Sequence, residues 1–176
     1  MLLPDSTFYM RKRIEEGDGC SIDGDNPFVW DIKTSKDLFE NKKVLIFGLP
    51  GAFTPTCTNS QLPGFEELYE DFMQKGIDEI WCTSVNDAFT MFQWAKNLGI
   101  EKVKMLPDGN GDFAEALGVL KDKSNLGFGK RSWRYAMLVD NLEFKNTWVE
   151  PGLMDNCPTD PYSVSNPQNV LGSLND

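Results

Sequence analysis

The sequence predicts an α/β fold in which a central mixed sheet is flanked by helices. Three observations support this prediction. Residues 43–49 form a short, nearly continuous apolar run, strand-like and helix-like segments alternate from there to residue 117, and two adjacent β-like segments follow later in the chain. Alternating strands and helices predict parallel pairing, whereas adjacent β-like segments predict an antiparallel edge.

The first predicted elements lie between residues 43 and 97. Residues 43–49 are rich in β-branched and aromatic side chains, as expected of a strand covered on both faces. From about residue 56 to 75, apolar side chains recur every three or four positions and a glycine follows, which predicts a helix. Residues 80–85 are predicted as a second strand, and an Asn-Asp pair can cap a helix over residues 88–97.

The remaining elements complete the order. A third strand is predicted at residues 103–106, and after a turn rich in Asp and Gly a short helix is predicted at 113–117. Residues 135–139 and 144–149 are predicted as two strands of a hairpin. Asn166-Pro167 is a typical helix start. This order fits a thioredoxin-like core.

Length and composition indicate one folded unit. The chain has 176 residues, of which 40% are hydrophobic and 25% charged, which is typical of a globular domain. No linker or internal repeat divides it, so we expect a single domain over residues 1–176. Residues 1–40, with strand-like alternation over 7–14 and a Gly/Asp-rich turn at 17–25, are predicted to be an N-terminal extension packed on the core.

The charge balance and the apolar pattern exclude several classes of partner. There are 17 basic and 27 acidic side chains, and the net charge of −10 repels phosphate backbones and anionic membrane surfaces. We therefore expect no nucleic-acid and no membrane partner. The longest apolar runs are far shorter than the ~20 residues that span a bilayer. No secretory signal pattern is visible, so a cytoplasmic location is the expectation.

The four cysteines favour redox chemistry over metal binding. They are Cys20, Cys57, Cys82 and Cys157, with no Cys-x-x-Cys pair, and the chain has no histidine. These spacings do not build a zinc site, and no glycine pattern for a nucleotide occurs, so we expect neither metal nor cofactor. Cys82 is predicted to be a core residue and Cys20 an incidental exposed thiol.

Cys57 lies at a position that is typical of a reactive side chain. It lies between the first predicted strand and the helix that follows, where a binding crevice forms in α/β sheets and a helix N-terminus favours an anion. A free thiol is mostly protonated at neutral pH, and a helix terminus supplies less than half of the stabilisation that a thiolate needs. A cation is therefore required, and without histidine it must be arginine or lysine. Residues 128–135 supply such side chains directly before a predicted strand.

The segment around Cys57 resembles a known family. The pattern Pro50-x-x-x-Thr54-x-x-Cys57 is similar to the active site of peroxiredoxins, and Pro-Gly-Ala-Phe-Thr-Pro-Thr-Cys resembles their type II, or peroxiredoxin-five-like, branch. Three further segments resemble the same branch in order and spacing, and the likeness covers nearly all the chain from about residue 42 onward. These segments are Leu62-Pro-Gly-Phe65, Ser84-Val-Asn-Asp-Ala-Phe89 and Arg131-Ser-Trp-Arg134-Tyr-Ala-Met137.

The resemblance implies a role for each matching residue. Cys57 would be the peroxidatic cysteine, and Thr54 would hydrogen bond the peroxide and the thiolate. Arg134 would stabilise the thiolate and polarise the O–O bond. Pro50 would shield the sulfur from water, and Arg131 is a second, weaker candidate for contact with the pocket.

At two positions the resemblance does not fix the role of the residue. Gln61 stands where many members of the branch have histidine, so this chain should differ if a titratable group matters there, although glutamine can still hydrogen bond. Cys157 lies roughly where some members keep an internal resolving cysteine, in a Pro-rich stretch that reads as an exposed loop. Other members use glutaredoxin, thioredoxin or glutathione, so both routes of recycling stay open.

The predicted function is a thiol-dependent peroxidase. It would reduce hydrogen peroxide and organic hydroperoxides through a cysteine sulfenic acid, in antioxidant defence and redox homeostasis. Resemblance to the branch also implies a homodimer. One alternative is a peroxide sensor or holdase that uses the same cysteine without fast turnover. A general dithiol–disulfide oxidoreductase is disfavoured because Cys57 has no cysteine partner nearby.

Overall fold

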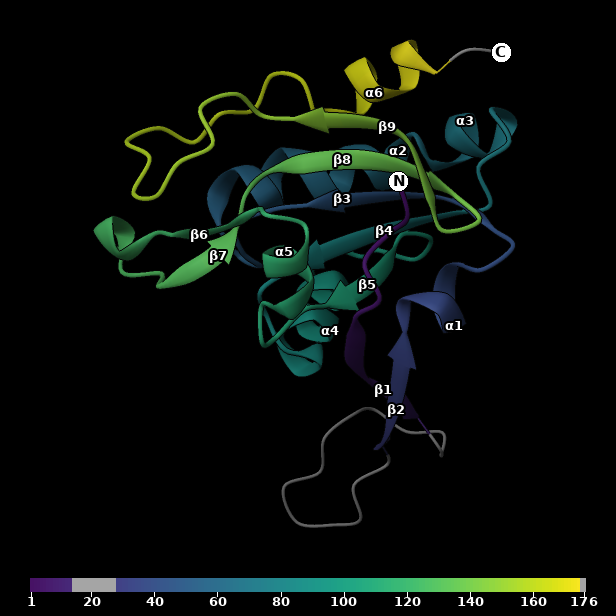
Figure 1. Cartoon of the computed structure of the whole chain (residues 1–176), viewed down its shortest axis with the longest axis horizontal. Coiled ribbons are helices and arrows are strands. Elements are labelled where there is room, and N and C mark those ends of the chain that lie inside the picture. Colours follow the sequence, from purple (N-terminus) through teal and green to yellow (C-terminus); the bar gives the residue numbers. More distant parts are fainter. Residues whose placement is uncertain (14–27, 175–176) are drawn as a thin grey trace.

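The computed structural model describes residues 1–13 and 28–174, and the predicted turn at 17–25 and Cys20 lie outside the described residues (Figure 1). Within the described residues the largest sheet has five strands, in the order β5-β4-β3-β8-β9. They are β5 (Lys104–Pro107), β4 (Glu79–Ser84), β3 (Lys43–Gly48), β8 (Tyr135–Asp140) and β9 (Glu143–Val149). β3, β4 and β5 run parallel, whereas β8 is antiparallel to both β3 and β9. The predicted mixed sheet is confirmed.

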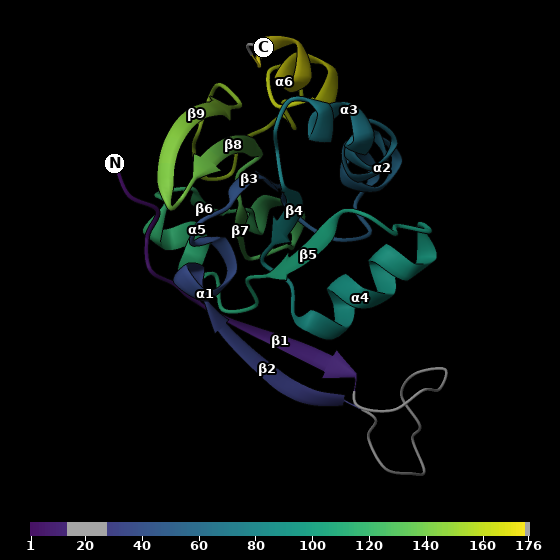
Figure 2. The same cartoon turned by 90° about the vertical axis from the view of Figure 1, so that its right-hand side faces the viewer.

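Helices cover both faces of this sheet (Figure 2). The helical elements are α1 (Ser35–Phe39), η1 (Cys57–Gln61), α2 (Leu62–Glu67), α3 (Tyr69–Gln74), α4 (Ala88–Asn97), α5 (Asp112–Ala116), the 3-10 turn η2 (Ser124–Leu126) and α6 (Pro167–Ser173). Side chains from α2, α3, α4 and α6 pack with Leu45 and Phe47 on one face. Side chains from α1 and α5 pack with Val44 and Ile46 on the other. β3 therefore lies between two apolar layers, as its continuous apolar run predicts.

The single helix predicted over residues 56–75 is wrong in detail. The chain begins there with a π-helical turn, η1, in which the Leu62 N–H bonds to the Cys57 carbonyl five residues back. Pro63 has no N–H to continue an α-helical ladder, which accounts for the wider turn. Farther on, Leu68 leaves ideal helical geometry with φ −91° and ψ 10° and separates α2 from α3.

The other predicted elements are confirmed within one or two residues. α4 covers residues 88–97, and the Asp87 carboxylate caps it by accepting the Thr90 N–H at 2.9 Å. α6 begins at Pro167, and the Asn166 side chain caps it. No helix in the described part of the chain is long and apolar enough to cross a membrane.

Two small antiparallel sheets were not predicted as such. One pairs β1 (Thr7–Arg13) with β2 (Phe28–Thr34), and the other pairs β6 (Leu120–Asp122) with β7 (Lys130–Ser132). The hairpin of β1 and β2 contacts α4 and β5, and the Arg11 guanidinium lies over the rings of Phe89 and Phe92 at 4.5 and 4.3 Å. Strands of three residues, such as β6 and β7, are too short to show periodicity.

Candidate active site

Cys57 is the first residue of η1, in the turn that follows the carboxyl end of β3. Only 1% of its surface is exposed. The loop before it is closed by its own backbone, because the Thr54 N–H bonds to the Gly51 carbonyl at 3.4 Å and the Thr58 N–H to the Thr54 carbonyl at 3.0 Å. Phe53 adopts a positive φ of 64° within this turn. The thiol is therefore held at the start of a helical segment, beside the end of a buried strand.

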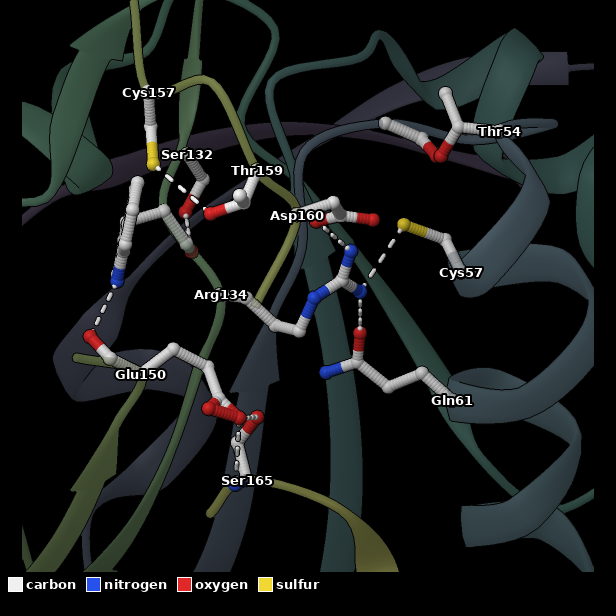
Figure 3. A network of polar contacts seen from close by, with 12 residues as sticks. Thr54, Cys57, Gln61, Ser132, Arg134, Glu150, Cys157, Thr159, Asp160 and Ser165 are labelled. Atoms are coloured by element: carbon white, nitrogen blue, oxygen red, sulfur yellow. Dashed lines mark hydrogen bonds and ion pairs between the residues drawn. The ribbon is translucent and has the colours of Figure 1, made fainter. Parts of the chain in front are cut away.

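Arg134 reaches this thiol from a distant part of the sequence. It directly precedes β8, whose Tyr135 is paired with Gly48 at the end of β3. Its Nη1 lies 3.4 Å from Cys57 Sγ, and only 2% of the arginine is exposed (Figure 3). The antiparallel pairing of two buried strands thus places a cation against the sulfur. The arrangement is the one in which a thiolate gains most from a neighbouring charge.

The guanidinium of Arg134 has three further neighbours. Nη1 also donates to Gln61 Oε1, Nη2 is paired with Asp160 Oδ1 at 2.6 Å, and the Tyr162 ring lies 5.4 Å from the guanidinium carbon. Burial acts to lower the pKa of Arg134, but attraction by Cys57 and the bond to Asp160 outweigh it and raise that pKa. Arg134 is therefore a permanent cation, and its buried Nε has no hydrogen-bond partner among the described residues.

Thr54 and Pro50 belong to one turn beside the sulfur, and Arg131 reaches this turn from β7. The Thr54 hydroxyl donates to the Gly51 carbonyl at 2.7 Å. Arg131 donates from Nη1 to the Pro50 carbonyl at 3.3 Å and from Nε to the Phe128 carbonyl at 3.1 Å. A Cβ on Gly51 would lie 2.6 Å from Arg131 Nη1, so a larger residue at position 51 would force the end of the Arg131 side chain to shift. Arg131 thus bonds the backbone of the turn.

Cys157 lies in a loop that is exposed on both sides of it, yet its own side chain is buried, which the sequence did not predict. Its Sγ is 3.6 Å from Thr159 Oγ1, and hydrogen bonds from the Thr159 backbone and side chain lower the pKa of this thiol. Figure 3 shows Thr159 and Asp160 between Cys157 and Cys57. Cys82 is buried as predicted, and burial raises the pKa of its thiol well above the usual range.

Sequence reasoning missed Asp160, Tyr162 and Glu150. Asp160 and Tyr162 contact the guanidinium of Arg134, and the Glu150 N–H donates to the Arg134 carbonyl at 3.1 Å. The sequence did hold one signal for such a partner, because an arginine placed in a buried site requires an anion or several hydrogen-bond acceptors. With 27 acidic residues in the chain, that signal could not select Asp160.

Comparison with known proteins identifies the family. The Redoxin family model matches residues 31–155. Peroxiredoxin sll1621 of Synechocystis sp. is 49% identical over 172 residues, which cover 98% of this chain and 88% of that protein. The chain belongs to the peroxiredoxins.

Two further likenesses refine this assignment. The hybrid peroxiredoxin hyPrx5 of Haemophilus influenzae is 47% identical over 145 residues, which cover 82% of this peroxiredoxin and 58% of the hybrid. The structure of reduced Prx3 from Vibrio vulnificus in complex with hydrogen peroxide matches with a TM-score of 0.80 and 36% identity, covering 99% of this chain and 93% of that one. The protein is a type II, peroxiredoxin-five-like enzyme with a thioredoxin-like fold. Its function is thiol-dependent reduction of peroxides.

Proposed function

We propose that Cys57 is the nucleophile of this peroxidase and that Arg134 keeps it reactive. The observation that carries the proposal is the 3.4 Å contact between Arg134 Nη1 and Cys57 Sγ inside a buried site. A fixed cation at this distance stabilises a thiolate more than it would in water, because solvent screening is weak there. The thiolate is the form that attacks peroxides.

The proposed reaction is one displacement at oxygen. The Cys57 thiolate attacks one peroxide oxygen, the S–O bond forms as the O–O bond breaks, and the cysteine becomes sulfenic acid. The second oxygen leaves as alkoxide or hydroxide and takes a proton from solvent, which gives an alcohol or water. Arg134 stabilises the charge that develops on the leaving oxygen. Hydrogen peroxide and organic hydroperoxides are both proposed as substrates.

Four neighbours complete the proposed catalytic site. Thr54 presents a hydroxyl oxygen that can accept the peroxide O–H while its own proton goes to the Gly51 carbonyl. Pro50 shields the sulfur from water. Arg131 holds the turn that carries Pro50 and Thr54 by bonding the Pro50 carbonyl. Gln61 replaces a titratable side chain by a neutral acceptor for Arg134.

For recycling, we propose that Cys157 resolves the sulfenic acid. Its thiolate would attack the Cys57 sulfur, an S–S bond would form, and hydroxide would leave and be protonated to water. The proposal is supported by a free thiol, by its lowered pKa and by the exposed loop around it. Glutaredoxin, thioredoxin or glutathione would then reduce the disulfide.

We further propose a cytoplasmic homodimer. The described cysteines Cys57, Cys82 and Cys157 are free, as is usual in a reducing compartment. Phe53, beside the site, is 53% exposed and offers apolar surface to a second copy. Light scattering coupled to size-exclusion chromatography would decide, because a mass of one chain at micromolar concentration would contradict the dimer.

Stopped-flow oxidation by hydrogen peroxide tests the central role of Cys57. Cys57→Ser should lose at least about 10³-fold in rate, because it removes the thiol to which Arg134 is hydrogen bonded. Cys82→Ser is the matched control and should react as the wild type does. A rate that survives in Cys57→Ser would contradict the proposal. The relatives are named as peroxiredoxins, so the sensor or holdase alternative is not favoured.

A further inference from the structure

Glu150 is a buried carboxylate outside the proposed catalytic site. It directly follows β9, and 1% of its surface is exposed. Its oxygens accept three successive backbone N–H groups, those of Ser163, Val164 and Ser165, and Val164 N lies at 2.8 Å. They also accept the hydroxyls of Ser163 and Ser165, each at 3.3 Å. Five donors therefore converge on one side chain.

This convergence fixes a stretch of loop to the sheet. A buried carboxylate is costly unless several hydrogen bonds compensate for its lost hydration. The same residue is bonded through its backbone, because its N–H donates to the Arg134 carbonyl and its carbonyl accepts the Trp133 indole N–H at 2.8 Å. Glu150 thus joins the segment between β7 and β8 that carries Arg134 to the loop at residues 163–165. Figure 3 shows Glu150 bonded to Ser165 on the same side of Arg134.

The loop residues just before Ser163 are those that contact the guanidinium. Asp160 pairs with Arg134 Nη2 at 2.6 Å, and the ring of Tyr162 lies over the guanidinium. The Asp160 side chain is itself 49% exposed, so water competes for it, and an exposed ion pair alone is weak. The bonds from Glu150 fix the chain at Ser163, three residues after Asp160. Asp160 therefore loses less conformational entropy when it pairs with Arg134.

We propose that Glu150 is a positioning residue for the peroxidase reaction. By binding residues 163–165 it holds Asp160 and Tyr162 against Arg134, and so it fixes the guanidinium in the orientation that meets Cys57. This inference rests on the proposed role of Arg134. The Asp160 carboxylate acts by pairing with Arg134 and not by acting on the sulfur, since a second anion near the sulfur would by itself disfavour the thiolate.

That distinction predicts a specific signature. Glu150→Gln should slow oxidation of Cys57 by hydrogen peroxide about 10-fold, as loss of a supporting contact commonly does. Alkylation of Cys57 by iodoacetamide at pH 7 should change less than about 2-fold, because the charge of Arg134 stays near the sulfur and iodoacetamide needs no bond from the guanidinium to its leaving group. General loosening of the fold would instead expose the sulfur and accelerate alkylation. Accelerated alkylation would therefore overturn the proposal.

A double-mutant cycle on the full chain tests the route through Asp160. Asp160→Asn should also slow oxidation about 10-fold, and the double variant should be no slower than the slower single variant. Glu143→Gln, an exposed carboxylate on β9 paired with Lys145, is the matched control and should react as the wild type does. A double variant about 100-fold slower than the wild type would show independent effects and overturn the inference.

Two further variants keep the test decisive. If Glu150→Gln does not fold, Ser165→Ala removes one donor to the same carboxylate and should slow oxidation about 2- to 3-fold, with no further loss beside Asp160→Asn. Full additivity in that cycle would overturn the inference as well. Arg134→Met distinguishes a failure of the proposed function from a failure of the proposed role of Glu150. If it oxidises as fast as the wild type, the proposed function fails, whereas a slow Arg134→Met with additive cycles removes only the role of Glu150.

Discussion

Two segments meet at Arg134, and they are built in different ways. Residues 50–61 carry the thiol and are organised mainly by short-range bonds, such as that from the Thr58 N–H to the Thr54 carbonyl, with Arg131 bonding the Pro50 carbonyl from outside the segment. Residues 150–165 carry the acidic partner and are held by long-range bonds to a buried carboxylate. The nucleophile is therefore placed by local chain geometry, whereas the cation is oriented by tertiary contacts. The comparison separates what makes the thiol available from what makes it reactive.

The largest effect in this comparison should follow from removing the cation. Arg134→Met should slow oxidation of Cys57 by hydrogen peroxide about 10²- to 10³-fold, as removal of one preorganised donor does at other sites of developing negative charge. Arg134→Lys should fall between this variant and the wild type, because a single ammonium cannot bond Cys57, Gln61 and Asp160 in the same geometry. Stopped-flow fluorescence measures both rates. Equal rates for all three proteins would contradict the account.

A smaller effect is expected from the contact that the first segment makes with Arg134. Gln61→Met removes the neutral acceptor of Nη1 and the bond from Gln61 Nε2 to the Gly48 carbonyl. Loss of one such hydrogen bond should slow peroxide oxidation about 3- to 10-fold. The same stopped-flow assay applies, with Gln74→Met at the end of α3 as control. A loss as large as that in Arg134→Met would mean that orientation comes mainly from the first segment.

Cys157 tests whether the second segment also takes part in recycling. Cys157→Ser should leave the first oxidation of Cys57 within about 2-fold of the wild type, because the side chain of Cys157 contacts Thr159 and does not bond to Arg134 in the described part of the chain. Steady-state turnover with thioredoxin or glutaredoxin should fall about 10-fold, since the disulfide that these reductants attack cannot form. Turnover measured with each reductant decides whether Cys157 resolves the sulfenic acid of Cys57. Unchanged turnover with all of them would rule out a resolving role.

A buried carboxylate elsewhere should affect stability and leave the rate unchanged. Burial raises the pKa of Asp108 to about 6, although the N–H groups of Phe113 and Ala114 bond its oxygens. The folded pKa lies above the unfolded value of 3.8, so the contribution of this group to stability is full below about pH 4 and is lost as pH rises through 6. Relative to Asp108→Asn, the wild type should lose about 2 kcal/mol of unfolding free energy between pH 4 and pH 7. Urea unfolding checks this.

Parallel stability curves for the wild type and Asp108→Asn would contradict that assignment. The rate of peroxide oxidation at pH 7 should stay within about 2-fold of the wild type. A large loss of rate would show that a buried carboxylate outside the two segments also affects the thiol. The contacts around Arg134 would then not be what distinguishes the effect of Glu150 on the rate.

The same contrast explains what the sequence could predict. The apolar run at 43–49, the capped helix at 88–97 and the hairpin strands were predictable because each leaves a local pattern, and all were found. Cys57 was singled out by its place after a strand. Arg134 needed the resemblance to a family, since spacing alone does not show which arginine meets a thiol.

What the sequence did not predict depends on contacts between distant residues. The π-helical turn depends on the missing N–H of Pro63, a signal that also fits an ordinary helix start. Asp160 meets Arg134 across 26 positions, and Glu150 binds a loop 13 to 15 residues later, in a stretch without periodicity. Such pairings become visible only when the sheet brings the segments together.

The contact between Arg134 Nη1 and Cys57 Sγ is proposed to keep this thiol reactive at neutral pH. The rate of Cys57 alkylation by iodoacetamide at pH 7 tests that role, in chains whose other cysteines are serine. Wild-type Cys57 should react at least about 10-fold faster than Cys57 in Arg134→Met, because a neighbouring cation favours the reactive thiolate. Equal rates for the two proteins would contradict this role of Arg134.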